Sequence, residues 1–246
     1  MTITRIALVL LMAAPLAADP LTDVRAALGR FNGREPVRVA YELQQSVANE
    51  GKFGNDKFNG KVAVEITGDA SGYHLVVPQA LLEQIEREQV ARDHNPKLTT
   101  PLANALSEID TVEAAEVIDL APRLMRLIDG AKVVSDATGT WAGKPARVVI
   151  LRAQDRIDPD DASKMKIAEN KVTLWLDSEN VPLAVEHMFA GKFSFLFLKG
   201  ETRQKKSWHL ARAGNRLIRA RYELTSTSSG MGQKGLETVV ATAHVR

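Results

Sequence analysis

The sequence predicts an α+β protein in which a curved antiparallel sheet of about ten or eleven strands is covered by a helical insertion. Short segments of alternating apolar and polar residues, separated by tight turn residues, occupy both ends of the chain. A segment of helical periodicity, residues 79–129, interrupts them after the third strand. Because strands and helices do not alternate along the chain, a parallel α/β sheet is excluded.

The first eighteen residues have the pattern of a secretory signal peptide. Arg5 supplies a positive charge, residues 6–14 form a short apolar run, and small residues follow at Ala17 and Ala18. We expect cleavage near Ala17 or Ala18 and a periplasmic protein in which residues 19–246 form a single domain. The chain contains no cysteine, so it has neither disulfides nor a cysteine for lipid attachment, which fits a bacterial periplasmic protein.

The segment before the insertion predicts a short helix and three strands. Residues 19–30 have helical spacing, and Asn32 and Gly33 end the helix. Residues 37–47 alternate as in a half-buried strand. We expect the polar residues 50–60 to form a loop, followed by strands at 62–66 and 73–77.

The helical insertion begins after Pro78. Its apolar residues recur at helical spacing until Asn95 and Pro96 end the first helix. Helical spacing resumes over residues 100–128, where we expect Thr111 to cap a helix and Pro122 to kink it or start another. The wide apolar stripe of these helices needs a sheet face to cover.

The rest of the chain predicts strands joined mostly by tight hairpins, an antiparallel meander. One turn is expected at Trp141–Pro145, another at Ser178–Asn180 and a third at Gly191 and Lys192. The expected strands are 131–138, 146–153, 171–177, 182–190, 193–198, 203–212, 216–224 and 236–245.

Residues 193–198 form the most apolar of these strands, with phenylalanines on one face and leucines on the other. Trp175 lies opposite the aliphatic face of a neighbouring strand. We expect the inserted helices to cover this surface, and to leave a cavity for a hydrophobic ligand if they do not fill it. Ordinary core packing is the alternative. The expected cavity-lining residues are Trp175, Phe193, Phe195, Phe197, Leu81, Leu82, Ile85, Leu124 and Ile128.

One hairpin adds a family resemblance. Residues 171–177, KVTLWLD, followed by Asn180-Val-Pro-Leu183, resemble a hairpin of the periplasmic lipoprotein-carrier (LolA/LolB-like) superfamily. The resemblance implies an unclosed β-barrel whose concave face holds acyl chains under a helical lid, and a role in lipid binding or lipoprotein transport. Asn180 stands where a glycine is usual, and no residue here matches the arginine that locks the lid. No functional residue is therefore carried over.

The sequence contains no convincing catalytic or metal motif. Its five histidines do not form a zinc-binding spacing, and the acidic loop that begins at Asp155 departs from a calcium loop at Ala162 and Ser163. Serine-nucleophile and phosphate-binding signatures are absent as well. We expect no enzyme activity, no metal and no cofactor. The histidines are His74, His94, His187, His209 and His244.

The leading hypothesis is a non-enzymatic periplasmic protein that binds a lipid or another acylated or hydrophobic ligand. The alternative is a periplasmic sensor or protein-interaction module on the same fold with a filled core. The chain has 32 Lys and Arg against 30 Asp and Glu, so its net charge is close to zero and does not favour binding to nucleic acid. A basic hairpin, residues 203–221, is expected to be a solvated face, with lipid headgroups or an acidic protein as alternative partners. Beyond residue 18 no segment is apolar enough for an integral membrane protein.

Overall fold

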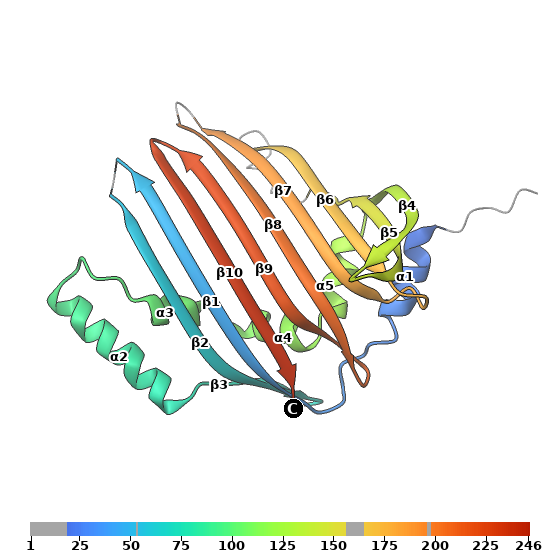
Figure 1. The fold of residues 1–246 in the computed structure, drawn as a ribbon, viewed down its shortest axis with the longest axis horizontal. Coiled ribbons are helices and arrows are strands. Elements are labelled where there is room, and N and C mark those ends of the chain that lie inside the picture. Colours follow the sequence, from blue (N-terminus) through green and yellow to red (C-terminus); the bar gives the residue numbers. More distant parts are fainter. Residues whose placement is uncertain (1–18, 53, 156–164, 196–197) are drawn as a thin grey trace, which may run out of the picture.

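The residues that the structure describes form a ten-stranded antiparallel sheet and five helices, and the unclosed antiparallel sheet with a helical insertion is confirmed. The computed structural model describes residues 19–52, 54–155, 165–195 and 198–246. The strand order is β3-β2-β1-β10-β9-β8-β7-β6-β5-β4, so every strand pairs with its neighbours in the chain except where β1 meets β10 (Figure 1). The sheet is an unclosed barrel because β3 and β4 stay apart at its two edges.

Most strands are long, and the β4–β5, β6–β7 and β8–β9 pairs contain register shifts. They are β1 (Val37–Gly51), β2 (Asp56–Asp69), β3 (Gly72–Val76), β4 (Lys132–Trp141), β5 (Lys144–Arg152), β6 (Met165–Leu176), β7 (Pro182–Phe195), β8 (Leu198–Ala213), β9 (Arg216–Gly230) and β10 (Gln233–Val245).

The helices begin where the sequence provides start signals. Asp19 accepts a hydrogen bond from the backbone N–H of Leu21 at the start of the first helix, and Asp110, rather than Thr111, caps the fourth. Pro122 lies in the first turn of a new helix, one of the two alternatives expected for it. The helices are α1 (Pro20–Leu28), α2 (Gln79–His94), α3 (Pro101–Ser107), α4 (Thr111–Ile118) and α5 (Ala121–Ile128).

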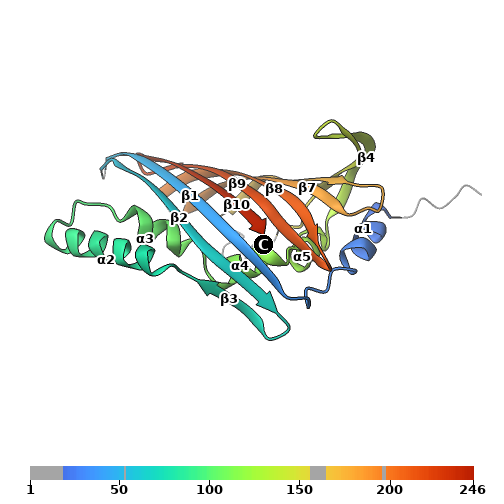
Figure 2. The same cartoon turned by 60° about the horizontal axis from the view of Figure 1, so that its bottom comes forward.

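The helices lie on the concave side of the sheet (Figure 2). One core cluster joins α1 and α5 to β5, β6 and β7, and a second joins α3 and α4 to β1, β2 and β10. Helix α3 begins directly over Gly60, where a Cβ atom would lie 2.0 Å from the carbonyl oxygen of Pro101. Only glycine permits this close approach of helix and strand.

Helix α2 does not cover the sheet, contrary to our expectation. It has no buried residue and lies beyond the β2 edge in Figure 1. Two side chains link it to the fold: Leu81 packs, partly buried, against the second core cluster, and the Glu88 carboxylate accepts hydrogen bonds from the backbone N–H groups of Leu102 and Ala103 at the start of α3. Helical spacing in the sequence identified α2, but four of its first ten residues carry charge, so its apolar stripe is too narrow to hold it on the sheet.

Two further expectations were wrong. Residues 50–60 are not one loop, because β1 runs to Gly51 and β2 starts at Asp56. Residues 193–198 are not one strand either: β7 runs through Gly191 to Phe195, and Phe195 is the pairing partner of Leu198 across the hairpin. Gly191 keeps an ordinary extended backbone and forms no turn.

Along the described residues, no helix has the length and apolar character needed to cross a bilayer.

Candidate functional site: the open half of the concave face

The concave face divides into two halves along the strands. Val185 pairs with Trp208 and Trp208 pairs with Tyr222, and all three contribute to the core beneath the helices. Moving two residues along each strand toward the other end of the sheet keeps the side chains on the same face. We call the end of this face that contains Val185, Trp208 and Tyr222 the covered half. We call the rows from Phe189 to the hairpin that joins β7 to β8 the open half. None of the described helices packs over the open half.

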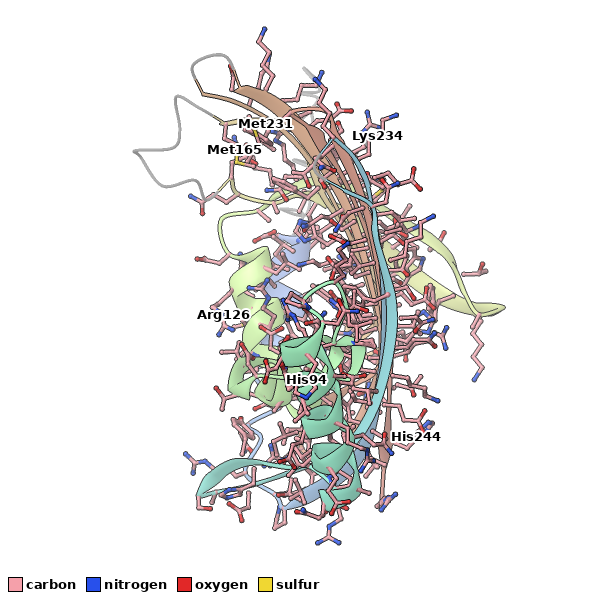
Figure 3. All side chains as sticks on the ribbon, turned by 90° about the vertical axis from the view of Figure 1, so that its left-hand side faces the viewer. His94, Arg126, Met165, Met231, Lys234 and His244 are labelled. Carbon is pink, nitrogen blue, oxygen red and sulfur yellow. The ribbon has the colours of Figure 1, made fainter. Side chains whose placement is uncertain are left out.

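Figure 3 shows this division from the side. The helices occupy the lower and middle part of the concave side, and the labelled Met165 and Met231 lie above them.

The floor of the open half on β6 and β7 is apolar. Its side chains pack on glycines: Met165 and Phe189 lie over Gly191, and the ring of Phe193 lies over Gly200. Phe193 is 41% exposed, and the other members are half-buried. We call this surface the apolar floor, and it consists of Met165, Ile167, Phe189 and Phe193.

A row of polar residues separates the apolar floor from the core. His187 pairs with Lys206 across β7 and β8, one row below Phe189. On the far side of the same row, the Gln45 amide donates hydrogen bonds to Glu237 (2.8 Å) and to Glu108 (3.2 Å). Burial, together with the charge of Glu237, raises the pKa of Glu108. The row therefore carries Lys206 over β8, and its far end at Gln45 is bordered by two carboxylates, Glu108 after α3 and Glu237, which lies on β10 one row further, in the row of Phe189.

His187 is held in one orientation. The Asn170 amide group donates to the carbonyl oxygen of Gln154 (3.3 Å) and to Asp155 (3.0 Å), so its oxygen faces His187 Nε2 at 2.8 Å. Nε2–H therefore donates, and Nδ1 of the neutral ring is an acceptor. Burial, with the neighbouring Lys206 and Arg123, lowers the pKa of His187 to about 4. The ring is neutral at pH 7.

A buried ion pair lies between the row and the helices. Arg219, 2% exposed, pairs with Glu113 of α4, which also accepts a hydrogen bond from the Tyr41 hydroxyl at 2.7 Å. The guanidinium stacks on the Tyr222 ring at 4.6 Å. Burial and the adjacent Glu113 raise the pKa of Tyr41, so its hydroxyl stays protonated and donates. This cluster fixes α4 to β9 and β1.

The structure brings only some of the expected site residues together. Leu124 and Ile128 are 0% exposed in the core cluster beneath the helices. A side chain lining a water-sized cavity would keep accessible surface on that side, so these two pack against neighbours all round. On α2, Leu81 packs partly buried against the second core cluster, Ile85 is half-buried and Leu82 is 44% exposed, so these three residues do not form the expected lid over the sheet.

Trp175 lies on the outer face of the sheet. Its ring centroid is 5.0 Å from that of Trp141, which in turn lies 5.0 Å from His209. Trp141 thereby ties the β4–β5 hairpin to the convex side. Of the expected phenylalanines, Phe193 belongs to the apolar floor, while the side chain of Phe195 and all of Phe197 lie outside the described residues.

Sequence reasoning missed the residues that define the open half. Phe189 and Lys206 alternate with outward-facing neighbours as any strand residues do. Arg219 was expected on the solvated face, but a register shift between His209 and Leu210 leaves both Ile218 and Arg219 buried. The only available signal was the spacing of Phe189, Gly191 and Phe193, which fits one strand face if Gly191 is not a turn.

Other candidate sites have no counterpart in the geometry. No group of three histidine, aspartate or glutamate residues within the described ranges could hold a metal ion. The acidic loop, apart from Asp155, and the signal-peptide residues lie outside those ranges.

Comparison with known proteins gives a distant result. No model of a protein family matches the chain, and no curated protein sequence does. Among solved structures, the crystal structure of MucB in complex with MucA(peri) matches at 10% sequence identity and a TM-score of 0.21, over 92% of this chain and 94% of that one.

Proposed function

We propose that the protein is an exported, non-enzymatic binding protein that receives the apolar part of a lipid or acylated ligand on the open half of its concave face. The observation that carries the proposal is the apolar floor. Phe189, Phe193 and Met165 lie half-exposed on glycines instead of packing into a core, and they adjoin one another. Contiguous exposed apolar surface on a folded protein is typical of an interaction site.

The energetics favour an elongated ligand. Covering apolar surface contributes roughly 25 cal/mol per Å², so a ligand must lie along the floor to gain useful affinity. Glycine and small residues in the neighbouring rows of β8, β9 and β10, such as Gly200, Ser228 and Gly235, leave room for it on the sheet. The proposed ligand site therefore lies on the open half, and not beneath the helices as the sequence had led us to expect.

The test uses a neutral fluorescent probe, N-phenylnaphthylamine, whose emission rises in an apolar site. Wild type should bind it, and Phe189→Ala should weaken binding about five- to tenfold because a large aromatic surface is lost. Met188→Ala is the matched control, since Met188 is the next residue of β7 and faces the outer side. Failure of wild type to bind the probe, or equal weakening by both substitutions, would contradict the proposal.

A sensor or protein-interaction module is the second candidate. It is favoured by the packed core beneath the helices together with a floor that is open to solvent. Native mass spectrometry of protein purified from its own periplasm separates the two candidates: a co-purifying lipid supports the first, and a bound polypeptide supports the second.

A further inference from the structure

Lys206 lies in the polar row beside the open half, and it is a cation for which the described residues provide no partner. Its side chain points to the concave side between His187 and Leu224. No hydrogen bond or ion pair to Lys206 is found within the described residues. Burial and the nearby Arg123 lower the pKa of Lys206. An ammonium in this position is costly unless an anion compensates it.

The carboxylates near Lys206 are already paired with arginines. Glu113 pairs with Arg219, and Glu116 lies 3.4 Å from Arg123 and 4.0 Å from Arg126. His187, the remaining titratable neighbour, is neutral at pH 7. Lys206 therefore has no carboxylate of its own among these residues.

We propose that Lys206 binds the anionic end of the ligand, so that the ligand class is an anionic single-chain amphiphile. This inference rests on the proposed function and specifies its ligand. The carboxylate lies at Lys206, and the chain follows the apolar floor past Phe189 to Phe193. Six residues of β8 separate Lys206 from Gly200, beneath Phe193, which corresponds to roughly 20 Å of strand. A long acyl chain covers this distance.

The charges of the polar row orient such a ligand. Glu237 and Glu108 lie on the β1 and β10 side and repel an anion, whereas Lys206 lies on the β7 and β8 side. An anionic end is thereby directed to the strands that carry the apolar floor. A cationic amphiphile would meet Lys206 at the same place and be excluded.

The experiment compares palmitate with its methyl ester by displacement of N-phenylnaphthylamine at pH 8, where the acid is ionised. Wild type should bind palmitate about ten- to a hundredfold more tightly than the ester, the range expected of one charge-assisted hydrogen bond in a buried site. Lys206→Met should remove this preference and leave ester binding unchanged, and Lys206→Arg should keep it.

Lys205→Met is the matched control. Lys205 is the preceding residue, points to the outer face and pairs with Glu186 at 2.8 Å. Its removal should leave the preference for palmitate intact.

The outcomes separate this inference from the proposed function. Equal binding of palmitate and ester by wild type overturns the anionic ligand and leaves the hydrophobic site standing. Binding of neither contradicts the proposed function itself. If Lys206→Met does not fold, Lys206→Gln decides the matter, because it keeps a long polar side chain and removes only the charge: a palmitate preference that persists undiminished in this variant overturns the inference.

Discussion

The same strands build both halves of the concave face, but helices cover only one of them. In the covered half, Trp208, Val185 and Leu174 are at most 2% exposed because α1 and α5 lie over them. Four to eight residues further along the same strands, Phe189 and Phe193 lie on glycines with one side free. The alternation of side chains along a strand determines on which face of the sheet each one lies. Whether that face is buried depends on whether a helix covers it. The covered half accounts for stability, and the open half is available for binding.

The largest expected difference concerns the ion pair that fixes the covered half. Arg219→Met leaves Glu113 buried beside Tyr41 without its counter-ion, and should lower the free energy of unfolding by about 3–5 kcal/mol. Urea denaturation followed by circular dichroism measures it. The double variant Arg219→Met with Glu113→Leu should recover most of this loss because no charge is then left unpaired. A single-variant loss below about 1 kcal/mol would show that the pair does not hold α4 in place.

Two leucines of the insertion sharpen the contrast between helices. Leu124→Ala removes a fully buried side chain from α5 and should cost about 2–5 kcal/mol. Leu82→Ala on α2 removes a side chain that is 44% exposed and should change stability by less than about 0.5 kcal/mol. Thermal melts of both variants test the difference, and equal losses would mean that α2 packs as a lid in solution.

The polar row predicts a pH dependence. The pKa of His187 is about 4 in the folded protein against 6.5 for the free side chain, because burial disfavours the charged ring. The unfolded chain therefore binds the proton first, and stability falls as pH drops from about 6.5 toward 4. His187→Gln should flatten this part of the stability profile, whereas His244→Gln, at an exposed position, should not. An unchanged slope in His187→Gln would assign the effect to another group.

A small effect on stability is also expected at the apolar floor. Phe193→Ala should change the free energy of unfolding by less than about 1 kcal/mol, because this ring is 41% exposed. The same variant should weaken binding of the neutral probe. A large stability loss would indicate that Phe193 belongs to a packed core rather than a binding surface.

The sequence was informative wherever one local pattern decides the outcome. Alternation identified the meander, Pro122 marked a helix start, and the Asn180 turn has the positive φ of 61° that suits asparagine. It was misleading where distant contacts decide. Both α2 and α5 have apolar residues at helical spacing, and spacing alone did not show that the stripe of α2 is too narrow to hold it on the sheet. Gly191 is compatible with a turn or with a strand under a phenylalanine ring, and only the pairing with Thr202 distinguishes them.

The pairing of β1 with β10 has a consequence for how the chain acquires its structure. Every other strand pair is a hairpin between consecutive segments, so β1–β3 and β4–β9 can each form as soon as they are synthesised. Within the sheet, the two units are joined by β10, which hydrogen-bonds to β1 on one side and β9 on the other, and α4 adds contacts to both units. The thirteen-residue strand β10, Gln233–Val245, therefore connects the two parts of the sheet. Before β10 is in place, the chain has two half-sheets with open edges, and only the pairing of β10 on both sides joins them into one sheet.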